Sequence, residues 1–379
     1  MQENLISVGA KDILIRELKD SLNEQRELNK TLQLALNISN IQVQELTVQV
    51  KYVNEMPLYR QEKDWLQYGF ELSRATMANW VIECTDKYLR VLYEFYHRLL
   101  LSREFAMADE SPIQFLKEEG REATAKSYMW LFRSGEDDTP PIVLYKYAST
   151  CSGDVAKEFL KGFNGYLMAD GYTGYNKVQD IKRCCCFAHI RRYFFDAIPK
   201  GKNRDISCPA VQGVEYCDKL FAYERQFKEK GYSYKQIKNG RLKKEKPVIE
   251  AFLSWLEKQK TIKGSKFATA VTYALNRKEH MMTYLEDGRC SLSNNLSEQK
   301  MKSYVIGRKG WLFSDSPKGA EASAISYSIA ETALANGLNV YKYITYILEK
   351  RPTEEMADSE LEKLLPWNDK VFEMCKIER

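Results

Sequence analysis

Apolar residues recur at alternating steps of three and four over the first fifty residues. Positions 15, 18, 22, 32, 36, 43, 46 and 50 hold Ile, Leu or Val, and polar residues interrupt the series at positions 25, 29 and 39. No Gly or Pro falls between Lys11 and Glu55, so this heptad spacing predicts one long helix that pairs in a coiled coil. A long amphipathic helix packed on its own chain is the alternative. Pro57 is expected to end the helix.

Two shorter helical patterns follow, one on each side of a glycine turn. Residues 58–68 have helical spacing, Gly69 opens a turn, and Ser73 fits the N-cap of a second helix that starts at Arg74. A helix, a short turn and a capped helix are typical of a helix-turn-helix, although any two-helix hairpin has the same outline. DNA contact and a plain helical hairpin therefore both stay open for residues 57–100.

From residue 103 the period changes from that of a helix to that of a strand. Strands are expected at residues 103–109, 127–133, 142–149, 165–170 and 183–189, with a helix at 152–163 and another at 191–198. Three antiparallel strands, a crossover helix and a further parallel strand open an α/β fold of the ribonuclease-H-like type, the core of retroviral integrases. In that fold the first and fourth strands are neighbours.

The second half of the chain returns to helical patterns. Residues 199–287 are rich in Lys and carry no strand signal, with helices expected at 248–259 and 267–285. Helices are also expected at 296–304, at 320–336 with Gly337 as C-cap, and at 340–350. The predicted divisions are a leucine-rich helix (1–56), a helical segment (57–100), a first core part (101–198), a helical insertion (199–287), a second core part (288–350) and a C-terminal element (351–379).

Composition and charge narrow the class of protein. The 379 residues are 44% hydrophobic, but no apolar stretch approaches the roughly 20 residues of a membrane helix. The N-terminus lacks the pattern of a signal peptide. We therefore expect no membrane association and a cytoplasmic location. The nine cysteines contain no Cys-x-x-Cys pair and there are three histidines, which leaves few ligands for a structural zinc site and weakens any Ser-His-Asp site.

The net charge of +5 is mild, and basic residues concentrate between Arg225 and Lys246. A solvated helical face and a surface for a polyanion both explain this run.

Two of the predicted strands end in the same tripeptide, Met-Ala-Asp, which puts Asp109 and Asp170 at strand ends. Such aspartates are often turn formers, but here the two strands are expected to be neighbours. Glu298 lies in the first turn of a predicted helix. Together the three carboxylates suit two Mg²⁺ or Mn²⁺ ions and phosphodiester chemistry. Glu110 is the rival to Asp109, although consecutive strand residues point to opposite faces. The long interval from Asp170 to Glu298 predicts an inserted domain.

Other candidate residues lie near these acids. Cys186 and His189 have metal-like spacing, but two residues do not make a zinc site, and a structural role is favoured. A basic cluster beyond Glu298 predicts contacts to the DNA backbone, with an ordinary charged helix face as the alternative. This cluster consists of Lys300, Lys302, Arg308 and Lys309, with Trp311 adjacent. Arg191 and Arg192 are weaker candidates for DNA contact.

Several of these segments resemble motifs of the IS-66 family of bacterial insertion-sequence transposases. They are Ala108-Asp109-Glu110-Ser111-Pro112, Asp170-Gly171-Tyr172, Cys186-Phe187-Ala188-His189-Ile190-Arg191-Arg192, Asn294-Asn295-Leu296-Ser297-Glu298, Ile306-Gly307-Arg308-Lys309-Gly310-Trp311-Leu312-Phe313 and Leu365-Pro366-Trp367. The resemblance runs from about residue 57 to the end, and the leucine-rich helix also has a counterpart in the family.

The resemblance implies a DDE transposase that uses Asp109, Asp170 and Glu298 with two Mg²⁺ or Mn²⁺ ions to cleave DNA strands and transfer them. It implies DNA partners (element ends and target), a helical insertion before Glu298, a homo-oligomer through the N-terminal helix, small accessory proteins and association with the bacterial nucleoid. Family members commonly carry a cysteine-rich, zinc-binding module after that helix, whereas here residues 52–56 run directly into Pro57. An inactive remnant that binds DNA or oligomerises, and a nuclease of the same fold, remain alternatives.

Overall fold

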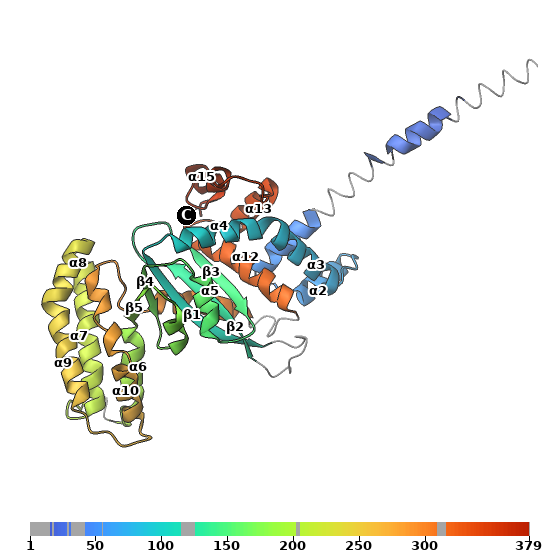
Figure 1. Cartoon of the computed structure of the whole chain (residues 1–379). Coiled ribbons are helices and arrows are strands. Elements are labelled where there is room, and N and C mark those ends of the chain that lie inside the picture. Colours follow the sequence, from blue (N-terminus) through green and yellow to red (C-terminus); the bar gives the residue numbers. More distant parts are fainter. Residues whose placement is uncertain are drawn as a thin grey trace, which may run out of the picture.

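The protein folds around a five-stranded mixed sheet with strand order β3-β2-β1-β4-β5 (Figure 1). The computed structural model describes residues 16, 19–28, 30–31, 42–54, 56–114, 126–201, 205–308 and 316–378, without the side chains of residues 114, 303 and 306–308. The strands are β1 (Phe105–Gln114), β2 (Lys126–Ser134), β3 (Val143–Ala148), β4 (Tyr166–Ala169) and β5 (Lys182–Cys185). Helices outnumber strands among these residues, so the fold is a mixed α/β one.

The order of strands confirms that the first and fourth predicted strands are neighbours. β1 pairs antiparallel with β2 and parallel with β4, with Phe105 opposite Tyr166 and Met107 opposite Met168. The crossover helix α5 (Gly153–Phe159) joins β3 to β4 and begins at Ser152, whose hydroxyl accepts the N–H of Asp154. Continuing the β1–β4 register by two residues brings Asp109 level with Asp170.

The two faces of the sheet are buried in different hydrophobic clusters. Along β1, Ala106 and Ala108 belong to the first cluster, which also contains residues of α4 (Arg90–Leu101), α12 (Pro317–Ala335) and α13 (Val340–Lys350). Phe105 and Met107 belong to the second cluster, which contains residues of the helical insertion. This alternation is the two-residue period of a strand buried on both faces.

Helix α12 also closes the outer edge of β3. The hydroxyl of Thr332 accepts the N–H of Val143 at 3.0 Å and donates to its carbonyl at 3.0 Å. The hydroxyl of Ser328 accepts the N–H of Tyr145 at 2.8 Å. After α12, Gly337 adopts a φ of +79°, the left-handed conformation expected of the predicted C-cap region.

The insertion is helical, as the sequence pattern predicts, and packs beside β4 and β5 (Figure 1). Helix α6 (Phe187–Asp196) leads into it from the first core part. The described residues of the insertion form α7 (Pro209–Glu229), α8 (Tyr234–Gly240), the π-helix η3 (Arg241–Glu245), α9 (Lys246–Glu257), α10 (Lys266–Leu275) and the 3₁₀ turns η4 (Lys278–His280) and η5 (Thr283–Glu286). None of them forms a strand.

Two predicted boundaries in this region are wrong. The fifth strand ends at Cys185 instead of residue 189, because Phe187, Ile190 and Phe194 bury one helical face of α6. The predicted helix at 267–285 ends at Leu275. Beyond it, the Arg277 side chain donates back to the carbonyl of Tyr273 at 2.6 Å, and short 3₁₀ turns follow.

The helical hairpin near the N-terminus is confirmed. It consists of α2 (Leu58–Gln67) and α3 (Arg74–Cys84), with the Ser73 hydroxyl accepting the N–H of Thr76 at 3.1 Å. α3 continues through the π-helix η1 (Thr85–Leu89) into α4. The hairpin alone does not test DNA contact, which stays a prediction.

Part of the predicted long helix packs on its own chain, as in the alternative interpretation. Residues 42–52 are helical, and Val48 and Tyr52 are buried. The Gln49 amide donates to the Thr345 hydroxyl at 2.7 Å, and the hydroxyls of Tyr52 and Ser323 are 3.2 Å apart. The described residues 19–28 are helical and exposed, so pairing with a second copy stays a prediction there.

The C-terminal residues fold back onto the first cluster. They form α14 (Asp358–Leu361), the 3₁₀ turn η6 (Glu362–Leu364) and α15 (Asp369–Cys375). Across the described ranges, no helix combines the length and apolar character needed to cross a membrane.

Candidate active site

Asp109 and Asp170 meet where β1 and β4 run side by side. Asp109 lies within β1, two residues beyond Met107 and therefore on the same face, toward the insertion. Asp170 directly follows β4, and its Oδ1 accepts the N–H of Tyr172 at 2.8 Å. This hydrogen bond holds the turn after β4 and fixes one carboxylate oxygen of Asp170.

Glu298 approaches the two aspartates from α11 (Asn295–Arg308), where it occupies the first turn. The preceding Asn294 is fully buried, and its side-chain amide donates to the carbonyl of Ala108 at 2.8 Å. Because Ala108 is next to Asp109, this bond ties the start of α11 to the strand that carries the first acid. A contact between distant segments, made by the residue just before α11, thus helps to position Glu298.

The electrostatics of Asp109 reflect this convergence. The pKa of its carboxyl is raised to about 7, first by burial and then by the negative charges of Asp170 and Glu298. The backbone hydrogen bond with Glu110 and the positive charge of Arg192 act in the opposite direction. A carboxyl with two acidic neighbours and little solvent is a common feature of sites that bind cations.

Glu110 faces the other side of the sheet. Its Oε2 accepts a hydrogen bond from the Tyr175 hydroxyl at 2.6 Å, and Tyr175 is buried in the first hydrophobic cluster. Burial, followed by the charge of Asp170, raises the pKa of Glu110 to about 8. This arrangement supports Asp109 over Glu110 as the acid that faces Glu298.

The carboxylate oxygens of Glu298 have two different neighbours. Oε2 accepts from the Arg192 guanidinium at 3.2 Å, while Oε1 lies 3.6 Å from Nδ1 of His189. Oε1 is buried and has no hydrogen-bond partner among the described residues. Nδ1 of His189 also lies 3.3 Å from the sulfur of Cys186.

Among the described residues, the group of three potential metal ligands that lies closest together is Cys186, His189 and Glu298. Their ligand atoms all lie within 4.8 Å of one another. Asp109, Asp170 and Glu298 do not form so compact a group within the described structure, although the charges of Asp170 and Glu298 both act on Asp109.

Comparison with known proteins gives the family. Residues 43–322 match the model of the Transposase IS66 family, and residues 328–367 match the IS66 C-terminal element. The chain belongs to the IS66 transposase family.

The IS66-family chain is also similar to uncharacterized proteins of Sinorhizobium fredii. It is 29% identical to y4qI over 340 residues, which covers 84% of this chain and 61% of y4qI. It is 28% identical to y4jD over 336 residues, which covers 85% of this chain and 64% of y4jD. The chain thus spans about three-fifths of the length of these relatives.

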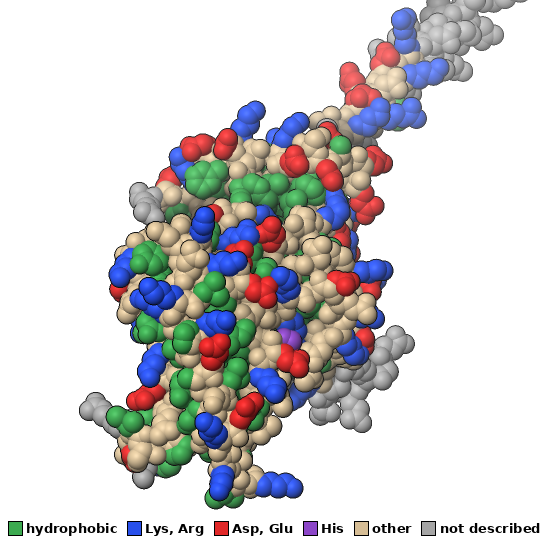
Figure 2. Space-filling view, turned by 60° about the vertical axis from the view of Figure 1, so that its left-hand side comes forward, with side chains coloured by type: hydrophobic (Ala, Val, Ile, Leu, Met, Phe, Trp, Pro, Cys, Tyr) green, Lys and Arg blue, Asp and Glu red, His purple; other side chains and the backbone are tan. Residues whose placement is uncertain are grey.

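The basic residues predicted to contact DNA are in varied surroundings in this IS66-family chain. Lys300 pairs with Glu331 at 2.6 Å, Arg191 with Asp218 at 2.5 Å, and Arg192 with Glu298. Lys302 is exposed. The side chain of Arg308, together with Lys309 and Trp311, lies outside the described residues. On the face drawn in Figure 2, basic side chains are interspersed with acidic and apolar ones.

An open groove on the insertion is linked through Arg277 to the turn that follows Asp170, and sequence reasoning missed it. Its volume is about 560 Å³, and its lining includes Tyr193, Lys263, Tyr273 and Arg277. The rings of Tyr193 and Tyr273 stack with centroids 4.0 Å apart, and the Arg277 guanidinium lies 3.5 Å from the Tyr273 centroid. Arg277 also donates to the carbonyl of Gly171. Nothing in the sequence signals this arrangement, since it depends on how the insertion folds back.

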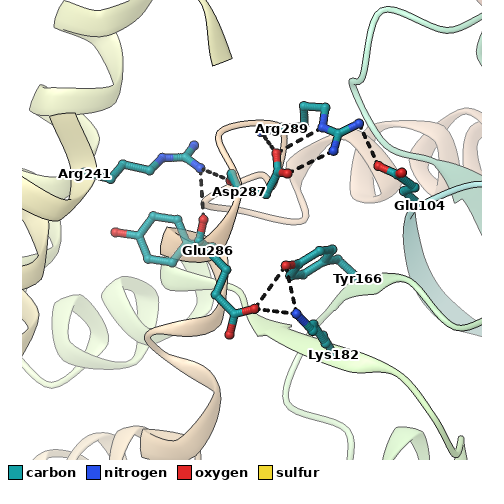
Figure 3. A network of polar contacts seen from close by, with 8 residues as sticks. Glu104, Tyr166, Lys182, Arg241, Glu286, Asp287 and Arg289 are labelled. Atoms are coloured by element: carbon teal, nitrogen blue, oxygen red, sulfur yellow. Dashed lines mark hydrogen bonds and ion pairs between the residues drawn. The ribbon is translucent and has the colours of Figure 1, made fainter. Parts of the chain in front are cut away.

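A polar network attaches the insertion to the sheet (Figure 3). Arg289 pairs with Asp287 at 2.9 Å and with Glu104, just before β1, at 2.7 Å. Lys182 of β5 pairs with Glu286 at 2.7 Å. The fully enclosed Arg241 donates to the carbonyl of Asp287 at 2.9 Å. The network therefore fixes the segment that leads from the insertion to Asn294 and Glu298.

Proposed function

We propose that this IS66-family chain is a DDE transposase that cleaves DNA strands and joins them at a site formed by Asp109, Asp170 and Glu298. The observation that carries the proposal is the meeting of two aspartates on neighbouring parallel strands with a glutamate from α11. The raised pKa of Asp109, caused by burial and then by the other two acids, supports their mutual proximity. The strand order β3-β2-β1-β4-β5 supports a ribonuclease-H-like core.

The donor atoms suit Mg²⁺ or Mn²⁺, which prefer carboxylate oxygens. The buried Oε1 of Glu298 lacks a hydrogen-bond partner within the described structure, as expected of an oxygen that binds a cation. Asp109, Asp170 and Glu298 would hold two ions. When bound, such ions activate the attacking oxygen and stabilise the leaving oxygen of a phosphodiester.

The protein's own contribution is to position these acids and the DNA. Asn294 ties α11 to β1, and Arg192 orients Glu298 through Oε2. Tyr175 keeps the Glu110 carboxyl on the opposite face. These contacts limit the rotamers of the proposed ligands.

We propose that DNA lies along the basic residues near Glu298 and the insertion groove that is linked to the turn after Asp170. Lys302, Arg308 and Lys309 would contact phosphates, which positions a duplex without reading its sequence. Lys263 and Arg277 would extend this track, and Tyr193 or Trp311 offers an aromatic surface for a base. A homo-oligomer through the exposed part of the N-terminal helix and small accessory proteins belong to the same proposal.

The test is Mg²⁺-dependent nicking of labelled DNA that carries the element's ends. Asp170→Asn should lower nicking at least a hundredfold and leave DNA binding unchanged, because the amide keeps the side chain's shape but loses its charge. Glu110→Gln is the matched control and should still nick. Nicking by Asp170→Asn at the wild-type rate would contradict the assignment.

A second candidate function is DNA binding or oligomerisation without strand cleavage. It is favoured by the run from Tyr52 to Pro57, which has no cysteine-rich segment between the helix and the core. The same assay separates the candidates. Joined products support the transposase, nicks without joining support a nuclease, and binding alone supports the inactive remnant.

A further inference from the structure

Cys186, His189 and Glu298 bring a thiol, an imidazole and a carboxylate to one point, where α6 and α11 meet. The imidazole Nδ1 is 3.3 Å from the Cys186 sulfur and 3.6 Å from Oε1 of Glu298. All three ligand atoms fall within 4.8 Å of one another. The proposed transposase chemistry uses Glu298 and has no role for the other two residues.

Two of these separations are close to those around a tetrahedral zinc ion. With Zn–S of about 2.3 Å and Zn–N and Zn–O of about 2.0–2.1 Å, tetrahedral angles put sulfur and nitrogen about 3.5 Å apart and nitrogen and oxygen about 3.3 Å apart. The observed 3.3 and 3.6 Å differ from these values by a few tenths of an ångström. Small rotamer changes are enough to close the difference.

The surroundings hold the three side chains in place but do not supply every ligand atom with a hydrogen-bond partner. Cys186 is 2% exposed, and its sulfur accepts the N–H of Asn294 at 3.2 Å. Burial raises the pKa of the Cys186 thiol to about 11 and lowers the pKa of His189, so the thiol is protonated and the imidazole neutral without a cation. A hydrogen bond from His189 to Cys186 would satisfy the ring nitrogen but would leave the buried Oε1 of Glu298 without a partner.

Two of the three side chains are partly exposed, although Cys186 and Oε1 of Glu298 are buried. The side chain of Glu298 is 29% exposed and that of His189 is 16% exposed. A fourth ligand, such as water, would come from the exposed part of these two side chains. Three protein ligands with an open position are typical of zinc sites that exchange a ligand.

We propose that Cys186, His189 and Glu298 bind a thiophilic divalent cation of the Zn²⁺ class. On binding, the Cys186 thiol releases its proton to solvent and its sulfur bonds to the cation, with no change of oxidation state. A consequence that rests on the proposed function is competition for Glu298, which cannot serve a soft cation and the Mg²⁺ site fully at the same time. Micromolar Zn²⁺ should then inhibit Mg²⁺-dependent nicking.

Binding is measured with Co²⁺ as a spectroscopic substitute for Zn²⁺, added to the full chain in a reductant without thiols. We expect thiolate-to-cobalt charge-transfer absorption that saturates at one ion per chain and disappears when Zn²⁺ is added. Cys186→Ser should abolish this band. Cys151→Ser, at a partly exposed cysteine outside the cluster, is the control and should retain it.

Glu298→Gln gives a second, independent variant at a partly exposed position. It should keep the charge-transfer band and weaken Co²⁺ binding at least tenfold. A wild-type chain without the band, or a band that persists in Cys186→Ser, would overturn the proposal. Asp109→Asn should bind Co²⁺ like the wild type while losing nicking, so this site and the proposed function can fail separately.

Discussion

Asp109 and Glu110 are consecutive carboxyls of one strand with opposite surroundings. Asp109 faces Asp170 and Glu298, whereas Glu110 is hydrogen-bonded to Tyr175 on the other face. Burial is the largest cause of the raised pKa in both, to about 7 for Asp109 and about 8 for Glu110. Since each folded-state pKa lies above its unfolded value, the folded protein binds more protons between about pH 4 and pH 8. The free energy of unfolding therefore falls as pH rises through this window.

Replacing Asp109 with Asn should reduce that loss of stability. In the absence of divalent cations, Asp109→Asn should be more stable than the wild type at pH 8, by on the order of 2 kcal/mol after allowance for partial solvent access. Urea unfolding at pH 5 and pH 8 in EDTA measures the effect. Millimolar Mg²⁺ should stabilise the wild type more than the variant. Equal pH dependence in both proteins would contradict the electrostatic interpretation.

At the residue scale, the sequence predicts the positions of the two aspartates better than it predicts which side chains contact the site. The predicted order of three strands, a crossover helix and a further strand puts the segments of Asp109 and Asp170 side by side, and the pairing of β1 with β4 confirms it. The predicted strand end at Asp109 is wrong, because β1 continues to Gln114. The approach of His189 to Glu298, and of Arg277 to Gly171, joins residues more than a hundred positions apart. Such contacts depend on how the insertion docks, which local periodicity does not encode.

At the scale of elements, α12 explains a pattern that the sequence leaves open. Its Ala-rich run predicts a helix, yet it carries Ser328 and Thr332 at fully buried positions. Their hydroxyls bind the backbone of β3, the edge strand of the sheet. A covered edge is protected from pairing with other chains. Helix spacing alone could not predict this role, because it requires knowing which strand lies alongside.

Thr332→Val keeps the shape of the side chain and removes both hydrogen bonds to Val143. The buried N–H of Val143 would then lack a partner, so we expect a loss of about 1–3 kcal/mol in the free energy of unfolding. Urea unfolding measures it, with the exposed Thr261→Val as control. Similar stability of the two variants would show that the edge contacts contribute little.

At the scale of the molecule, the sheet separates two hydrophobic clusters, and the insertion contains an ion pair between the buried Arg241 and the partly exposed Glu224. The Arg241 guanidinium is 2% exposed and donates to both carboxylate oxygens of Glu224 at 2.7 and 2.9 Å. It also reaches the carbonyls of Tyr284 and Asp287, near the polar network of Figure 3. The sequence predicts the insertion from the interval between acids, but it gives Arg241 only as one member of a basic run.

Arg241→Met should loosen the insertion and leave the rest of the sheet intact. Glu224 is 24% exposed, so its carboxylate keeps part of its hydration. Its loss of the Arg241 donor, together with the loss at the carbonyls of Tyr284 and Asp287, should cost about 1–3 kcal/mol. Hydrogen exchange should show faster exchange in α7 and α9, with β2 and β3 still protected. The exposed Arg225→Met is the control. If amide hydrogens exchanged faster in both hydrophobic clusters alike, the insertion would not unfold locally and the prediction would be wrong.

Asn294 has a consequence for the order in which the protein can become competent during synthesis. Its side chain binds the carbonyl of Ala108, and its N–H binds the sulfur of Cys186. Asn294 thus joins three elements: β1 with Asp109, the start of α6, and α11 with Glu298. The ribosome adds this residue late. A nascent chain can pair β1 with β4 long before it holds Glu298 in place. Products of premature termination within the insertion would therefore carry both aspartates without a complete acid triad.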